Sequence, residues 1–235
     1  MAPSSELAAG LMPSILCKPG EMMKTDDLVL MLATGVEASD PWTVEKRFMG
    51  ALGSGLLGTV LLFAALYGVS HDIGVLLALP AFWLKLAFAL AVLAAAGWMT
   101  VRLSRPGLQA RSGWILAAIP VALVWAAALP ELLSARPGER LPLALGHSWY
   151  ICSLNIALLS APVFAALLWA LRGLAPTRPA EAGAAAGLLS GALALMVYSL
   201  YCTEMEVPFW GVWYVLGMLA PALAGAKFGP RLLRW

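Results

Sequence analysis

The chain has 235 residues, of which 61% are hydrophobic and 12% charged, with a mean hydropathy of +0.84. Soluble domains are nearer half apolar and a quarter charged, so this composition excludes a disordered chain, a coiled coil and an ordinary soluble enzyme. The net charge of +2 is too small to indicate a nucleic-acid-binding protein.

The segment before the first apolar stretch divides into two parts. Residues 1–22 have no basic region ahead of an apolar run, and Pro3 and Pro13 interrupt them, so they do not resemble a signal peptide. We expect a disordered extension here, or a start codon assigned too early. Residues 23–47 are the only sizeable polar segment that follows, and we expect them to form a cytoplasmic tail.

One short helix is predicted within this tail. Thr25 is a suitable N-cap, and Asp26 and Asp27 follow in the first turn, where the helix dipole favours anions. Leu28 and Leu32 belong to the apolar run that comes next. Because a helix of about ten residues is marginal alone in water, it either packs on its own bundle or the membrane, or binds a groove on a partner.

Six apolar stretches follow, each close to the roughly 20 residues that a membrane-spanning helix needs. They cover residues 48–70, 82–101, 113–133, 150–171, 183–201 and 209–228. Their runs are continuous rather than alternating, which favours helices over a barrel. The predicted fold class is therefore an all-α polytopic bundle of six transmembrane helices, with residues 48–235 as one domain in the lipid bilayer.

The basic residues predict how this bundle is oriented. Twelve of the 15 lysines and arginines lie in the N-terminal segment, the second and fourth connections and the C-terminal end. The connections on the other side hold only Arg136 and Arg140. By the positive-inside rule both termini are expected in the cytoplasm.

Lys85 is the basic residue that falls inside a predicted span. A lysine within a span is costly and often functional. Lys85 lies within one turn of the predicted outer boundary, however, where its side chain can reach the lipid headgroups. Snorkelling is therefore slightly favoured over a functional ion pair.

Two glycine patterns lie within predicted spans. Residues 53–58 fit G-x-G-x-x-G, but they follow no predicted strand, so close helix packing is their expected role rather than nucleotide binding. Gly183, Gly187 and Gly191 recur every four residues in the fifth span, which also indicates close packing. Such small-residue faces would permit a homodimer.

Cys152 and Cys202 lie at the predicted outer ends of consecutive antiparallel spans. Neighbouring helices pack about 8–10 Å apart, and a disulfide needs Cα atoms within about 7 Å, so a bridge requires that both cysteines face the seam. His147 and Glu204 lie on the same side, and a set of Cys, His and carboxylate ligands can bind a soft or borderline metal ion. No CxxC spacing is present, so no metal site is firmly predicted. The alternative is that both cysteines are small buried apolar residues.

No Ser/His/Asp set or paired-carboxylate set stands out in the sequence, which predicts a protein that is not an enzyme. No charged residue lies at the predicted midplane and no clear repeat relates the two halves, which weighs against a transporter.

Several segments resemble, in their order along the chain, those of one known family, the NrsF-type negative regulators of extracytoplasmic-function (ECF) sigma factors. They are MKTDDL at 23–28, FWLK at 82–85, LAPTRP at 174–179, VWYVLG at 212–217 and GPRLLRW at 229–235. Cys152 and Cys202 match the two cysteines of the family, and the resemblance covers residues 23–235. Tyr201 departs from the family pattern, in which histidine usually precedes the second cysteine, so a metal role for that histidine does not carry over.

The resemblance implies a six-helix anti-sigma factor of the bacterial inner membrane that does not contact nucleic acid directly. Its partner would be an ECF sigma factor, held by tail residues that include Thr25, Asp26, Asp27, Leu28 and Leu32. Oxidative or metal stress would act on Cys152 and Cys202, with Lys85, His147 and Glu204 as accessory residues. No resident cofactor is expected, apart from a transient metal ion at the two cysteines.

Two hypotheses from other classes stay open at this point. A small transporter or metal exporter would not need residues 23–40. A membrane oxidoreductase would use the outer thiols and turn over a disulfide or quinone, although no quinone-site pattern supports it.

Overall fold

The computed structural model describes residues 25, 26, 29, 43–68, 73–105, 107–174 and 176–233. The chain divides into two units, residues 1–40 and residues 41–235. In the first unit the described residues Thr25, Asp26 and Val29 are helical and exposed. The second unit contains the long apolar helices.

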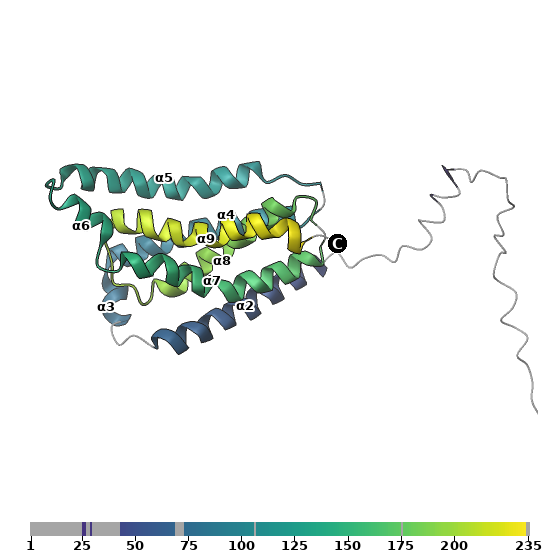
Figure 1. Ribbon diagram of the computed structural model, residues 1–235, viewed down its shortest axis with the longest axis horizontal. Coiled ribbons are helices and arrows are strands. Elements are labelled where there is room, and N and C mark those ends of the chain that lie inside the picture. The colour runs from purple at the N-terminus through teal and green to yellow at the C-terminus, as the bar shows by residue number, and fades with distance from the viewer. Residues whose placement is uncertain are drawn as a thin grey trace, which may run out of the picture. The chain divides into compact units, whose positions relative to one another are not determined.

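The described part of residues 41–235 is helical and contains no strand. The helices are α2 (Thr43–Tyr67), α3 (Ile73–Ala78), α4 (Pro80–Leu103), α5 (Arg111–Ser134), α6 (Arg140–Leu145), α7 (Trp149–Arg172), α8 (Pro179–Tyr198) and α9 (Val207–Leu232) (Figure 1). Six of them (α2, α4, α5, α7, α8 and α9) are long and apolar enough to cross a membrane. The predicted all-α bundle with six spans is confirmed, and the six helices indicate a multi-pass membrane protein.

The first span ends earlier than the sequence pattern predicts. Helix α2 stops at Tyr67 rather than Ser70, because Gly68 adopts a left-handed conformation with φ of +70°. The Gly68 N–H donates to the Ala64 carbonyl at 3.1 Å, which closes the last turn. A glycine in this conformation is a common way for a helix to end.

Two short helices, α3 and α6, lie in connections for which the sequence predicts no helix. Each has six residues, too few for an apolar run to show a helical period. Helix α6 is fastened to α9, because the Trp213 indole Nε1–H donates to the Ala144 carbonyl at 2.9 Å. Both helices lie at the end of the unit opposite the C-terminus (Figure 1).

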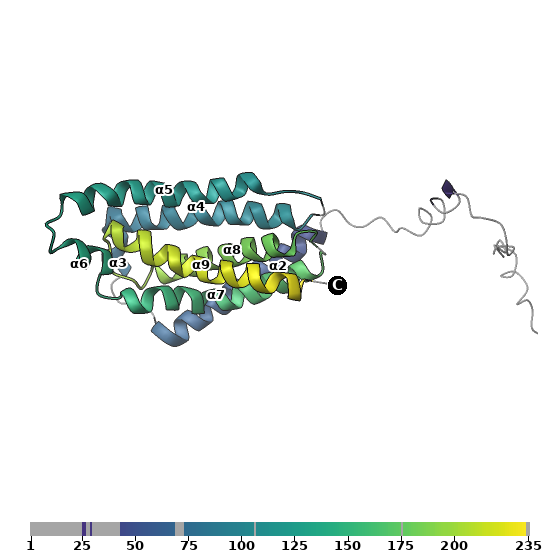
Figure 2. The same cartoon turned by 45° about the horizontal axis from the view of Figure 1, so that its top comes forward.

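Helix α8 is the most buried of the six long helices, and it packs against α9, α7 and α4. Helix α2 packs mainly on α7, and α5 packs on α4 and α9 (Figure 2). The most apolar 18 residues of α2 and those of α5 are only 17% buried inside the protein, compared with 67% for α8. The core of the unit is therefore built around α8, with α2 and α5 at its periphery.

Helices α8 and α9 approach each other backbone to backbone. A Cβ added at Gly183 would collide with the carbonyl oxygen of Gly225, and one added at Gly187 would collide with the carbonyl oxygen of Pro221. At Gly191 the nearest atom would be the Met218 Cα, at 2.9 Å. The close-packing role predicted for the glycines of the fifth span is confirmed.

The glycines at 53–58 contribute unequally to packing. A Cβ at Gly55 would lie 2.7 Å from the Val163 Cα, and one at Gly58 would lie 3.0 Å from the Pro162 Cβ, so both face α7. A Cβ at Gly53 would meet no atom within 4 Å. The predicted packing role therefore holds for Gly55 and Gly58 but not for Gly53.

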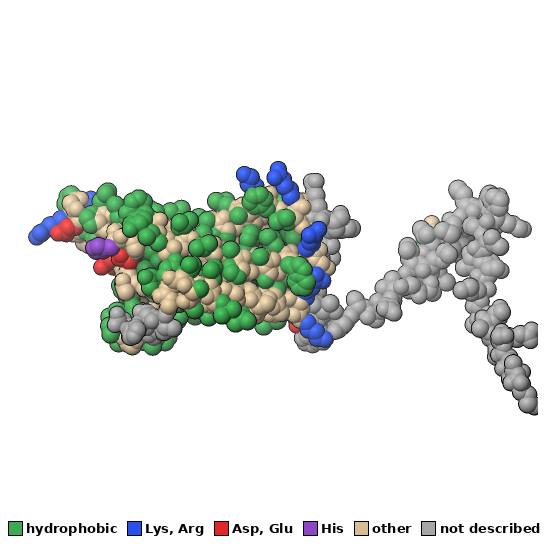
Figure 3. Space-filling model, turned by 60° about the horizontal axis from the view of Figure 1, so that its bottom comes forward, with side chains coloured by type: hydrophobic (Ala, Val, Ile, Leu, Met, Phe, Trp, Pro, Cys, Tyr) green, Lys and Arg blue, Asp and Glu red, His purple; other side chains and the backbone are tan. Residues whose placement is uncertain are grey.

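The outer surface of the second unit has the distribution expected of a protein in a bilayer. Hydrophobic side chains cover the flank in Figure 3, and the lysines, arginines and acidic residues gather at the two ends. The exposed basic residues at the end near the C-terminus include Arg102, Arg111, Arg172 and Lys227. A wide apolar band between two charged rims matches the hydrocarbon core between headgroup layers.

A buried hydrogen bond joins α2 to α7 and yields a first prediction. The Thr59 hydroxyl donates to the Leu159 carbonyl at 2.9 Å, and Thr59 is fully buried. Thr59→Val is expected to lower the free energy of unfolding by about 1 kcal/mol, since interhelical hydrogen bonds in membranes contribute that order of energy. Unfolding in mixed detergent micelles, followed by circular dichroism, measures the change.

Ser54→Ala is the matched control for this prediction. The Ser54 hydroxyl bonds only within its own helix, to the Ala51 carbonyl at 3.3 Å. Its removal is expected to leave stability nearly unchanged. If the two variants lost the same free energy of unfolding, an interhelical contribution from Thr59 would be contradicted.

Candidate functional site

Both predicted sensor cysteines lie at one end of the second unit, which we call the thiol end. It is formed by the N-terminal turns of α4, α7 and α9, the C-terminal turn of α8, and residues 199–206 between α8 and α9. Cys152 lies in the first turn of α7, and Cys202 lies in the segment after α8. The prediction that consecutive helices bring the two cysteines to the same end is confirmed.

The two cysteines face each other across the seam between α7 and α8. Their Sγ atoms are 3.8 Å apart, and both residues are free thiols. Cys152 is 0% exposed and Cys202 is 4% exposed. The condition for a bridge, that both residues face the seam, is therefore met. An S–S bond of about 2.05 Å requires the two sulfurs to move closer.

Cys152 is held by polar groups of α7 and α8. Its Sγ lies 3.3 Å from the Ser148 hydroxyl and 3.4 Å from the Tyr198 hydroxyl. The Asn155 amide donates to the same Tyr198 oxygen at 3.4 Å. A chain of hydrogen-bonding groups thus runs along the buried side of this thiol.

The interpretation of Lys85 as a snorkelling side chain is wrong. Lys85 is 0% exposed, and its Nζ donates to the carbonyls of Cys202 at 2.9 Å and Glu204 at 3.1 Å. It also donates to the Tyr214 hydroxyl at 3.3 Å, so all three protons of the ammonium have acceptors. The side chain points inward, where the 199–206 segment supplies carbonyl oxygens that accept its protons.

Glu204 connects the segment that carries Cys202 to the start of the helix that carries Cys152. Its carboxylate Oε1 accepts the His147 backbone N–H at 2.9 Å and lies 3.4 Å from the Ser148 hydroxyl. These donors lie at the N-terminus of α7, where the helix dipole favours a negative charge. The predicted accessory residue Glu204 is therefore part of the thiol end.

His147 joins this end through its backbone rather than its imidazole. The imidazole is fully exposed, and its Nδ1 is 3.8 Å from the Glu204 carboxylate. Among the residues that the structure describes, no group of three or more His, Cys, Asp or Glu side chains is placed to hold a metal ion. The structure thus does not bring His147 to the thiols as the Cys, His and carboxylate set would require.

The two thiols differ in their electrostatic surroundings. A hydrogen bond from the Cys152 thiol and the positive charge of Lys85 lower the pKa of the Cys202 thiol to about 6, although burial acts in the opposite direction. A lowered pKa makes a cysteine a better nucleophile near neutral pH, because the thiolate is the reactive form. Cys202 is therefore the more reactive candidate of the two.

Four polar residues at this end were not predicted from the sequence: Ser148, Asn155, Tyr198 and Tyr214. Ser148 lies four residues before Cys152, a spacing that indicates a contact with that thiol. The Tyr198 hydroxyl reaches Cys152 from another helix, which local spacing does not predict. Asn155 is a polar amide within a span, which is itself a functional signal. Tyr214 has no such signal, because its contact with Lys85 depends on how α9 packs against α4.

The predicted sigma-binding residues lie in the first unit and are only partly described. Thr25 and Asp26 are helical and exposed, so Thr25 lies within the helix rather than at the predicted N-cap position. Asp27, Leu28 and Leu32 lie outside the described residues, and so does Cys17. Their proposed contacts therefore stay predictions.

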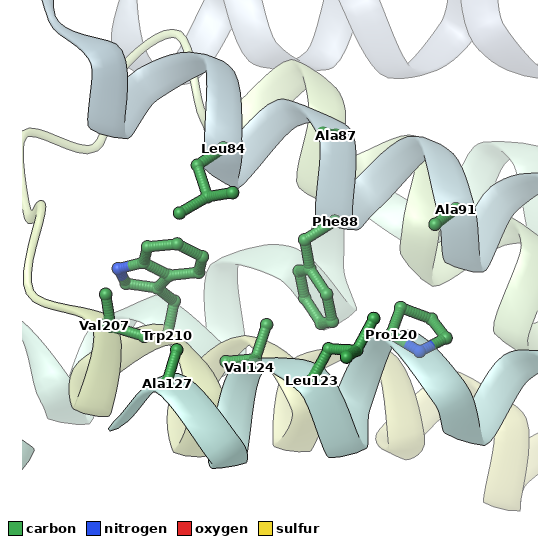
Figure 4. A pocket seen from close by; sticks show the side chains of 10 residues that line it. All are labelled: Leu84, Ala87, Phe88, Ala91, Pro120, Leu123, Val124, Ala127, Val207 and Trp210. Carbon is green, nitrogen blue, oxygen red and sulfur yellow. The ribbon is translucent and has the colours of Figure 1, made fainter. Parts of the chain in front are cut away.

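An apolar groove of about 230 Å³ lies between α4, α5 and α9 (Figure 4). Its lining includes Phe88, Val124 and Trp210, and every side chain that lines it is hydrophobic. The Trp210 indole Nε1–H donates to the Met205 carbonyl at 3.2 Å, so this side chain also supports the segment after Cys202. A groove lined by hydrophobic side chains is poorly suited to bind a hydrated ion, which weighs against the exporter hypothesis at this position.

Comparisons with known proteins give a consistent result. The family described as "NrsF: Negative regulator of sigma F" matches residues 32–235. A protein of Azospira oryzae named "Probable anti-sigma-F factor NrsF" is 48% identical over 215 residues, covering 91% of this chain and all of that protein. The "Anti-sigma-F factor NrsF" of Caulobacter vibrioides is 38% identical over 219 residues, again covering 91% of this chain and all of the relative. No solved structure matches the chain.

Proposed function

The chain belongs to the NrsF family of negative regulators of sigma F, and from this premise we propose that it holds an ECF-type sigma factor at the bacterial inner membrane. Its relatives are named as regulators rather than enzymes. A bound sigma factor is kept from RNA polymerase, so transcription of its genes stays low until the complex dissociates.

In this proposal the N-terminal tail, residues 23–47, is cytoplasmic and binds the sigma factor. The positive-inside rule supports the orientation, because exposed arginines and Lys227 lie at the end of the second unit near the C-terminus. The tail helix would present Thr25, Asp26, Asp27, Leu28 and Leu32 to a groove of the partner. The exposure of Thr25 and Asp26 supports a helix with an accessible face.

In the same proposal the thiol end faces the periplasm and senses oxidative or metal stress. The observation that carries this part is the pair of buried thiols, whose sulfurs are 3.8 Å apart. The periplasm permits oxidised cysteines. A signal that modifies the pair must favour one state of the bundle over the other, and this difference in free energy is what would release the sigma factor.

Co-purification tests the function. Full-length protein is extracted from its own membranes in mild detergent, and the proteins that accompany it are identified by mass spectrometry. We expect one sigma factor in stoichiometric amount, and its loss when residues 23–40 are deleted. A preparation without a sigma factor, from unstressed cells that express one, would overturn the proposal, and transport in liposomes would then be measured.

Charged substitutions in the tail give a second prediction. Leu28→Asp together with Leu32→Asp is expected to release the sigma factor, because a buried carboxylate without a partner is strongly unfavourable in an apolar groove. A sigma-dependent reporter should rise in unstressed cells to its fully induced level. Leu11→Asp, outside the segment that resembles the family, is the matched control and should leave the reporter low. An unchanged reporter, with the double variant present in the membrane, would contradict binding through these leucines.

A further inference from the structure

Residues 202–206, which carry Cys202, are fixed from two directions. From α4, Lys85 holds the carbonyls of Cys202 and Glu204 at 2.9 and 3.1 Å. From the other direction, the Glu204 carboxylate is held by the backbone N–H of His147, just before α7. The position of Cys202 relative to Cys152 therefore depends on Lys85, a buried lysine of α4.

We propose that Lys85 is the positioning residue of the thiol pair, which presents Cys202 to Cys152 and makes Cys202 the sulfur that reacts first with a peroxide. This role deepens the proposed function and rests on it. Lys85 is 0% exposed, so its charge acts on the groups around it rather than on solvent. Burying an ammonium is costly unless it is hydrogen-bonded, and here three oxygen atoms accept its protons.

The titratable groups around the pair come from several elements of the described part of the chain. They are Tyr67 from α2, Lys85 from α4, Cys152 from α7, Tyr198 from α8, Tyr214 from α9 and Glu204 from the connecting segment. Lys85 is the basic group that acts on Cys202, whose pKa is lowered to about 6. The Cys152 thiol and the Tyr214 hydroxyl act on Cys202 in the same direction through hydrogen bonds.

The reaction with a peroxide balances with these two residues alone. The Cys202 thiolate attacks one oxygen of hydrogen peroxide, the O–O bond breaks, and the leaving hydroxide takes up the proton that Cys202 released. Cys202 is then a sulfenic acid. Cys152 loses its proton and attacks this sulfur, which forms the S–S bond and releases the second oxygen as water. Two thiols have lost two electrons, and one peroxide has become two waters.

The geometry favours this order of events. Cys202 lies in a connecting segment near a cation, whereas Cys152 lies in a helix with the hydroxyls of Ser148 and Tyr198 around its sulfur. The sulfurs must close from 3.8 Å to about 2.05 Å.

The rate of disulfide formation as a function of pH tests the role of Lys85. Purified full-length protein in mild detergent is treated with hydrogen peroxide, and peptides are identified by mass spectrometry so that Cys17 is scored separately. For the wild type we expect the pH–rate profile to have its midpoint near 6. In Lys85→Met the midpoint should move toward the ordinary thiol value of about 8.5.

At pH 6 the rate in Lys85→Met should fall, with about tenfold as the upper limit that a complete shift would give, because the hydrogen bonds from Cys152 and Tyr214 still lower the pKa of Cys202 in this variant. The thiolate fraction would fall by roughly 150-fold, and the stronger nucleophilicity of a more basic thiolate would offset about tenfold of that loss. Lys85→Arg keeps the charge and should keep the wild-type midpoint. Lys227→Met removes an exposed cation near the opposite end of α9 and should change neither rate nor midpoint.

Two outcomes would overturn the proposal. The first is a Lys85→Met rate that is lower at every pH with an unchanged midpoint, as a merely structural role predicts. The second comes from dimedone, which traps sulfenic acids: an adduct on Cys152 instead of Cys202 in the wild-type protein would reverse the order. The assay contains no sigma factor, so its failure is distinct from a failure of sigma binding in the co-purification.

Discussion

Gly225→Leu is expected to prevent α8 and α9 from packing together. Without this contact we do not expect the bundle to assemble. A Cβ at Gly225 would collide with the carbonyl oxygen of Gly183, and a leucine adds three further carbons at the same place. Overpacking usually costs about 1–3 kcal/mol. We expect more here, because the atom that the new side chain meets belongs to the backbone of Gly183, which has no alternative rotamer. Unfolding in mixed micelles, followed by circular dichroism, should show a midpoint lowered beyond that of any other single variant considered above.

Gly53→Leu is the matched control for this substitution. Gly53 also lies within a spanning helix, but a Cβ there would meet no atom within 4 Å. A leucine at this exposed position should leave stability unchanged or slightly raised, since glycine is a poor helix former. If Gly53→Leu and Gly225→Leu lowered the midpoint equally, the close contact between α8 and α9 would not be the cause.

Cys152→Ser and Cys202→Ser are each expected to abolish stress-induced release of the sigma factor. Each substitution removes one of the two sulfurs that lie 3.8 Å apart, so the pair cannot be joined. A sigma-dependent reporter in cells exposed to peroxide or to a soft metal ion should stay at its uninduced level. Compared with wild-type cells under the same stress, cells with either variant should show no induction of the reporter.

Cys17→Ser provides the control, because Cys17 lies outside the segment that resembles the family. Cells with this variant should respond as the wild type does. The membrane level of each variant is measured by immunoblot, which separates a lost response from a lost protein. A normal response in both Cys152→Ser and Cys202→Ser would contradict sensing by the thiols.

The six spans could be predicted from the sequence because the bilayer imposes a length and a composition on each helix. Four-residue glycine spacing likewise predicted the contact along α8, since it places the glycines on one face of the helix. The short helices α3 and α6 could not be predicted in the same way. Six residues show no period, and their formation depends on contacts such as that between Trp213 and Ala144.

At the thiol end, the sequence predicted that two cysteines share one end but not what surrounds them. Topology left open whether both face the seam, but that Cys152 and Cys202 lie at the same end could be predicted from it. The direction of Lys85 could not, because a lysine near a span boundary can reach either headgroups or protein carbonyls. The choice depends on the course of residues 199–206, and no local pattern encodes where the carbonyls of Cys202 and Glu204 point.

The contact between α8 and α9 determines how far a disturbance at the thiols can travel. Side chains between helices can absorb a small shift by changing rotamers, but Gly183 and Gly225 place backbone directly on backbone. The two helices are therefore expected to move as one rigid body, with the Cys202 segment joining them at one end. A displacement of the sulfurs would then be expected to move the far ends of α8 and α9 together.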